Sequence, residues 1–146
     1  MYSFRKSKKG FTLIELMVVV AIIGVLSLLG LRLYTGQQQK AKNAIVKANA
    51  GTIQTLIQAE LADRAIADLD TAGELTTIVF ANAGIYNPVD NTAQAACPAT
   101  EKAATAGQVW VTFTGAAGTT PAYWSINGKN ATNSANVFTV NLTARK

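Results

Sequence analysis

An uninterrupted apolar run near the amino end constrains this chain more than any other feature of its sequence. Between Phe11 and Leu31 only three side chains are polar: Thr12, Glu15 and Ser27. As an α-helix the run would be about 31 Å long at ~1.5 Å per residue, which matches the hydrocarbon thickness of a bilayer. The run therefore predicts a membrane-spanning helix rather than part of a soluble core.

Glu15 is the residue of this run that needs an explanation. An acidic side chain at the centre of a membrane helix costs roughly 2.5–3.5 kcal/mol on insertion scales, and less near the interface, so such residues are functional candidates. The simpler alternative is a carboxylate that snorkels to the membrane surface, because Glu15 lies close to the start of the run.

The net charge of +5 suggests an anionic partner such as nucleic acid until the charges are located. Four of the thirteen Lys and Arg residues lie within the first ten residues, where there is no acid. Without that leader, nine basic residues face eight acidic ones and the net charge falls to +1. The basic segment is therefore interpreted as a targeting signal. The positive-inside bias predicts a cytoplasmic amino end and a head outside the membrane.

The sequence predicts neither an enzyme nor a metalloprotein. Histidine is absent and Cys97 is the only cysteine, which excludes an intramolecular disulfide and zinc sites of the Cys/His type. Cys97 is expected either as an inert, half-buried thiol or as one end of an intermolecular bridge. The acids between Asp63 and Glu74 are expected to form a solvated helix end rather than a calcium site, and no catalytic constellation is present.

Strong helix formers continue the helix beyond the apolar run. The polar segment that follows has no proline before Pro88, and its apolar residues recur at spacings of three and four. This stripe comprises Ile45/Val46, Ala50, Ile53, Leu56/Ile57 and Leu61. One helix from about Phe11 to Leu69 would be about 88 Å long at ~1.5 Å per residue, with an apolar first half and an amphipathic second half.

The rest of the chain is typical of a small β-sheet domain. Residues 73–107 read as a connecting region, with a short helix or strand expected at 75–80. Three segments rich in β-formers follow, separated by loops that contain glycine. The segments are 108–114, 122–127 and 136–143, and the loops are 115–121 and 128–130. We expect an α+β fold in which a three-stranded antiparallel meander packs against the amphipathic helix.

These features divide the chain into four parts. The parts are a leader at 1–10, the transmembrane half of the helix at 11–35, its amphipathic half at 36–72, and a globular head at 73–146 whose sheet occupies 108–146.

The amino-terminal residues resemble those of the type IV pilin superfamily, which comprises the pilins of type IV pili and the pseudopilins of type II secretion. The resemblance rests on Lys8-Lys9-Gly10, on Phe11-Thr12-Leu13-Ile14-Glu15-Leu16, and on the apolar run to Leu31. It implies the type IV pilin fold, cleavage between Gly10 and Phe11 by a prepilin peptidase, and N-methylation of Phe11. It also gives Glu15 a role in assembly, which is to meet the new terminal amine of a neighbouring subunit.

The chain departs from the family pattern at two places. Arg32 stands where the anchor often has a proline, and the cysteine pair that closes a carboxy-terminal loop in many pilins is missing. Gly24, Gly30 and Gly36 each weaken the helix by about 1 kcal/mol relative to alanine. Two interpretations stay open for these glycines: local melting of the helix in the filament, and close helix packing at small residues.

The resemblance implies a structural protein without a cofactor. We expect the major subunit of a bacterial type IV pilus, held in the inner membrane by a single span before assembly and displayed on the cell surface afterwards. Its partners would be copies of itself, the prepilin peptidase, and the assembly platform with its motor.

Two alternatives are kept. One is a pseudopilin of a type II secretion or competence system, and the other is a minor tip adhesin or DNA-binding pilin. In the second case the aromatic residues of the head would stack on nucleic acid, namely Trp110, Tyr123, Trp124 and Phe138. The head has few basic residues, so tight nucleic-acid binding is not expected.

Overall fold

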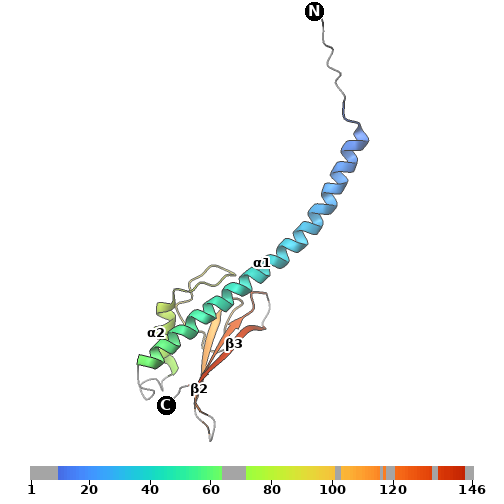
Figure 1. The fold of residues 1–146 in the computed structure, drawn as a ribbon. Coiled ribbons are helices and arrows are strands. Elements are labelled where there is room, and N and C mark those ends of the chain that lie inside the picture. Colours follow the sequence, from blue (N-terminus) through green and yellow to red (C-terminus); the bar gives the residue numbers. More distant parts are fainter. Residues whose placement is uncertain are drawn as a thin grey trace, which may run out of the picture. The chain divides into compact units, whose positions relative to one another are not determined.

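The computed structural model describes residues 10–63, 72–100, 103–115, 117, 121–132 and 135–143. Its elements are, in chain order, α1 (Leu13–Asp63), α2 (Ala72–Ala83), β1 (Val109–Thr114), β2 (Tyr123–Lys129) and β3 (Asn136–Thr143). A long α-helix is thus followed by a short helix and a three-stranded antiparallel sheet (Figure 1). This arrangement confirms the expected α+β fold.

Contacts within the chain divide it into two units, and the division falls between Gln37 and Gln38, inside α1. In the first unit every large hydrophobic side chain from Phe11 to Tyr34 is exposed. Among the described residues, α1 is the one helix long and apolar enough to cross a membrane, and its most apolar window has a mean hydropathy of 2.7. The expected boundary at residues 35 and 36 between the two halves of the helix stays a prediction.

The second unit has a hydrophobic core to which α1, α2 and the sheet all contribute. From α1 come Val46, Ala50, Ile53 and Ile57, none of which has exposed surface. Their spacings of four and three put them on one stripe of the helix, as the sequence predicted. Ile45, which the sequence also allowed in this stripe, is 47% exposed, because adjacent residues of a helix point about 100° apart and Val46 is the one that faces the core.

The second helix, α2, covers the same core. Leu75, Val79 and Phe80 are each 1% exposed and belong to the cluster that contains the α1 stripe. The sequence allowed a helix or a strand here, and the structure has a helix of 12 residues. The expected end of the long helix near Leu69 lies outside the described residues, in which α1 ends at Asp63.

The sheet has the strand order β1-β2-β3, and both pairings are antiparallel, so the expected meander is confirmed. Trp124 in the central strand pairs with Phe113 of β1 and with Leu142 of β3. Its ring centroid lies 4.6 Å from that of Phe113, at an interplanar angle of 42°. This row of large side chains faces the helices, since all three belong to the core or pack against it.

The central strand β2 is longer than the sequence predicted. Gly128 and Lys129, expected in a loop, are the last residues of β2, and the pairing with β3 shifts register between them. A Cβ at Gly128 would lie 2.8 Å from Cγ1 of Val46 on α1. The glycine that suggested a turn is therefore a point where the sheet and the helix approach closely.

Two asparagines of α1 fasten loops of the head to the helix. Asn49 Nδ2 donates to the carbonyl oxygen of Tyr86 at 2.8 Å, and Asn43 Oδ1 accepts from the N–H of Ala131 at 2.9 Å. Because these bonds join distant parts of the sequence, they fix the connecting region and the β2–β3 turn against the same helix.

Candidate functional site: the amino-terminal segment

The residues expected at the cleavage site lie just before α1. Gly10, Phe11 and Thr12 are exposed, and the helix begins at Leu13, two residues later than the sequence predicted. Phe11 is 85% exposed, and no heavy atom lies within 4 Å of the position that a Cβ would take at Gly10. The peptide bond between Gly10 and Phe11 is therefore outside the helix and open to a second protein.

The first turn of α1 is closed by a reciprocal hydrogen-bonded pair, Thr12 and Glu15. The Thr12 N–H donates to Glu15 Oε2 at 2.9 Å, and the Thr12 hydroxyl donates to the same oxygen at 2.6 Å. In return the Glu15 N–H donates to Thr12 Oγ1 at 3.3 Å. This is a capping box, in which a threonine at the N-cap and a glutamate three residues later satisfy each other's backbone donors.

The capping box explains what Glu15 does in the single chain. A helix start leaves backbone N–H groups without intrahelical partners, and a carboxylate there also interacts favourably with the helix dipole. The structure thus gives Glu15 a local partner, Thr12, which the sequence interpretation overlooked. The signal was present as Thr-x-x-Glu at the start of the apolar run.

Phe11 and Glu15 lie close together at the start of α1. They line a shallow depression of about 320 Å³ together with apolar side chains of the first turns, which are Ile14, Val18 and Val19. The pairing of Glu15 with the terminal amine of another subunit lies between chains and stays a prediction.

The three glycines expected to weaken the helix lie within an unbroken α1. Gly24, Gly30 and Gly36 have helical backbones, and nothing lies within 4 Å of the position that a Cβ would take at any of them. The Thr35 hydroxyl donates to the carbonyl oxygen of Arg32 at 3.0 Å, which gives that carbonyl a second partner near the last of the three glycines. Whether the helix melts or packs closely at these glycines in a filament stays open.

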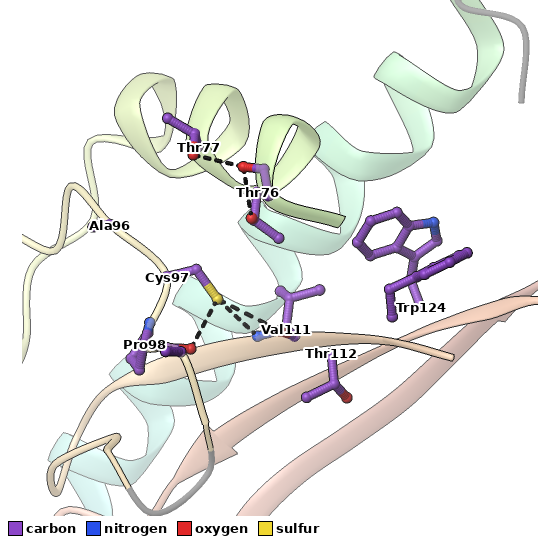
Figure 2. Close-up of a pocket in the computed structure, with 11 residues that line it drawn as sticks. Thr76, Thr77, Ala96, Cys97, Pro98, Val111, Thr112 and Trp124 are labelled. Atoms are coloured by element: carbon purple, nitrogen blue, oxygen red, sulfur yellow. Dashed lines mark hydrogen bonds between the residues drawn. The ribbon is translucent and has the colours of Figure 1, made fainter. Parts of the chain in front are cut away.

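Cys97 is a half-buried thiol held against the edge of β1. Its Sγ accepts a hydrogen bond from the Val111 N–H at 3.3 Å and lies 3.5 Å from the carbonyl oxygens of Pro98 and Val111. Burial raises the pKa of this thiol. Figure 2 shows the sulfur turned toward β1, in the wall of a cavity of about 480 Å³ that Trp124 also lines. The geometry agrees with an inert thiol in the single chain.

Gln94 also lies against the edge of β1, at Val109. Its amide accepts from the Val109 N–H at 3.1 Å and donates to the Val109 carbonyl oxygen, so one side chain satisfies both backbone groups of that residue. Exposed strand edges invite pairing with other chains, and covering them is a common protection. The Gln94 and Cys97 contacts therefore cover the β1 edge of the sheet at Val109 and Val111.

The aromatic residues considered for nucleic-acid stacking are largely inside the head. Trp110 and Trp124 are each 1% exposed. Lys129, a basic residue near the sheet, is 8% exposed; its Nζ lies 5.9 Å from the Trp110 ring centroid and donates to the Ala104 carbonyl oxygen at 2.7 Å. The two tryptophans and this lysine are thus engaged in packing and internal contacts.

The acids of the head form no evident cation site in the part of the chain that the structure describes, where no three or more His, Cys, Asp or Glu side chains are grouped to hold a metal ion. Asp90 instead caps a turn, because its carboxylate accepts from the N–H and the hydroxyl of Thr92 at 3.0 and 2.7 Å. These bonds lower the pKa of Asp90.

Sequence comparison finds relatives among fimbrial proteins. Residues 5–31 match the family described as "Prokaryotic N-terminal methylation motif". The chain is 43% identical over 63 residues to "Fimbrial protein EcpB" of Eikenella corrodens, across 43% of this chain and 40% of the relative. It is 41% identical over 61 residues to "Type IV major fimbrial protein FimA" of Dichelobacter nodosus, across 42% and 38%. It is 40% identical over 55 residues to "Type IV major alpha-pilin" of Moraxella bovis, across 38% and 35%. No solved structure matches.

These matches span about two fifths of the length of the relatives. The structure joins a capped apolar helix to a small α+β head in one chain, and the relatives it matches are named as fimbrial proteins and a pilin. Its amino-terminal segment carries the prokaryotic methylation motif at residues 5–31 and is similar to the amino-terminal part of type IV fimbrial proteins.

Proposed function

We propose that this chain is the major structural subunit of a bacterial type IV pilus, made as a membrane-anchored precursor and polymerised through its amino-terminal helix. The observation that carries the proposal is the exposure of every large hydrophobic side chain from Phe11 to Tyr34, each at 46% or more. So large an apolar surface is stable only in a bilayer or against other proteins. A pilin uses both environments in turn, first the membrane and then the filament.

The proposed processing step is cleavage between Gly10 and Phe11 by a prepilin peptidase, followed by methylation of the new amine on Phe11. The exposed, non-helical backbone at these residues supports it. Cleavage removes four basic residues and creates one cation directly before the capping box. The charge that holds the leader in the cytoplasm is thereby exchanged for a charge that takes part in assembly.

The proposed assembly contact pairs that amine with Glu15 of a neighbouring subunit. In a low-dielectric bundle two charges about 4 Å apart attract far more strongly than in water, although desolvation offsets much of the gain. Such a pair therefore sets the register between helices more than it adds stability. Thr12 holds the Glu15 carboxylate at the start of the helix, next to the terminus that is created by cleavage.

In this proposal the precursor spans the inner membrane once, and the assembled subunit lies in a filament on the cell surface. Copies of the chain, the prepilin peptidase, and the assembly platform with its motor are its partners. The relatives named as major fimbrial proteins and as a major pilin support the role of a repeated subunit.

The test is the incorporation of Glu15→Ala into filaments when it is produced together with the wild-type chain. We expect the variant to insert in the membrane but to be missing from sheared filaments, because its neighbour's amine has no carboxylate to meet. Ser27→Ala, which removes another polar side chain of the apolar run, is the matched control and should enter filaments normally. Equal incorporation of both variants would contradict the assembly role of Glu15.

Electron microscopy of cells with and without the chain separates the pilin from its alternatives. Loss of long surface filaments on deletion is the expected result. Intact filaments together with failed protein secretion or failed DNA uptake would instead identify a pseudopilin.

A further inference from the structure

The charges of this chain are separated along its sequence. Between Glu15 and Glu60 every charged residue is basic, and these residues are Arg32, Lys40, Lys42 and Lys47. From Glu60 to Glu101 seven of the eight charged residues are acidic. A basic block of the long helix is thus followed by an acidic block where that helix ends and the head begins.

The structure places the two kinds of charge on different surfaces of the second unit. Lys40 and Lys47 are exposed and seven residues apart, so they share one flank of α1, two helical turns from each other. Asp63, also exposed, follows Lys47 by sixteen residues, which at ~100° per residue puts it on the opposite flank of the buried stripe. Glu74, in the first turn of α2, is a second exposed acid and follows Asp63 by eleven residues in the sequence.

We call Lys40 and Lys47 the basic flank, and Asp63 and Glu74 the acidic end. Within the described residues, the structure records no ion pair for any of these four side chains. All four side chains are exposed, so their charges can face another molecule.

We propose that the basic flank of one subunit docks against the acidic end of a second copy in the filament. This inference rests on the proposed function, since it concerns how pilin subunits meet. A contact between two different patches of the same chain is heterologous, and a heterologous contact that does not close into a ring repeats as an open filament. Opposite charges on opposite flanks of one helix are the arrangement that such a contact needs.

The spacing of the charges gives the contact a defined displacement. If the long helices of two copies run parallel, Lys47 of one meets Asp63 of the other when the copies are offset along the helix by sixteen residues, or about 24 Å at ~1.5 Å per residue. The pairing of Phe11 with Glu15 needs an offset of about one turn, or ~5.4 Å. The two contacts therefore join a subunit to different neighbours in the helical array.

Anionic lipid headgroups are the competing partner for the basic flank. They would attract Lys40 and Lys47 but would repel Asp63 and Glu74, which lie on the same unit. A second copy offers Asp63 to Lys47, so that an acid of one subunit meets a lysine of the other. Charge complementarity thus favours a second copy over lipid headgroups as the partner of the basic flank.

The test is a charge exchange in cells that produce filaments from the full chain. Lys47→Glu and Asp63→Lys each replace attraction by repulsion, and each should lower the yield of sheared filaments about three- to tenfold, since exposed ion pairs are individually modest. The double variant, which carries both substitutions, puts opposite charges at the contact again and should restore the yield. Both changes suit α1, because Lys and Glu have similar helix propensities and a cation is favourable at a helix end.

Asn141→Lys, at an exposed position on β3, is the control for a new surface charge and should assemble normally. Wild-type yield from Lys47→Glu and Asp63→Lys would overturn the inference. A loss with Lys47→Glu that the double variant does not restore would also overturn it, and would point to lipid headgroups. Failure of the wild-type chain to form any filament would contradict the proposed function instead.

Discussion

Thr12→Val is expected to loosen the first turn of α1. Valine keeps the shape of threonine but lacks its hydroxyl, so the change removes the bond to Glu15 Oε2 at 2.6 Å and the bond from the Glu15 N–H at 3.3 Å. The backbone N–H of residue 12 still donates to the carboxylate. Loss of an N-cap costs about 0.5–2 kcal/mol, and at ~1 kcal/mol the open form of this turn becomes about fivefold more populated.

Amide hydrogen exchange in the full precursor, held in detergent micelles, measures this opening. We expect the Glu15 amide to exchange at least about fivefold faster in Thr12→Val, because the turn opens more often and the acceptor of this N–H is removed. Thr12→Ser keeps the hydroxyl and should exchange at nearly the wild-type rate. Thr35→Val, which removes a hydroxyl bond further along α1, is the control and should leave the Glu15 amide unchanged. Wild-type exchange in Thr12→Val would refute the capping role of Thr12.

Three further predictions concern the head. Gln94→Ala removes the buried amide that covers the edge of β1 and should lower the free energy of unfolding by about 2–4 kcal/mol in thermal melts, whereas exposed Gln58→Ala should change it little. Gly107→Ala would press a Cβ against the side-chain oxygen of Asn87, at a residue whose φ is +83°. In the same melts it should destabilise the head far more than Gly115→Ala, because nothing lies within 4 Å of the position that a Cβ would take at Gly115. Cys97 should react with iodoacetamide at neutral pH more slowly than free cysteine until urea unfolds the chain, because burial raises the pKa of its thiol; equal rates would contradict its half-buried placement.

Local periodicity accounts for the parts of the fold that the sequence predicted. The stripe formed by Val46, Ala50, Ile53 and Ile57 follows from helical spacing, because a helix next to a core must bury one side. The three strands and their antiparallel order follow from short β-rich segments joined by short loops.

Features that depend on contacts between distant residues escaped prediction. Gly128 resembles a turn residue in the sequence, and its place in β2 depends on Val46, far away on α1. Gln94 acts on Val109 across fifteen positions, through a side chain that mimics a neighbouring strand. The spacing of residues along the chain does not predict such contacts.

The candidate site also contains residues that the sequence predicted and residues that it did not. Glu15 was found because a carboxylate in an apolar run is costly, whereas its partner Thr12 was overlooked although their spacing is a local signal. The proposed contact between Lys47 and Asp63 needed the burial of α1, because only the buried stripe shows that the two residues lie on opposite flanks.

Mass spectrometry of the subunit in purified surface filaments tests the central claim most directly. We expect residues 1–10 to be absent and the chain to begin with N-methylated Phe11. Filaments built from chains that keep the leader, or that begin at another residue, would contradict the proposed processing and assembly.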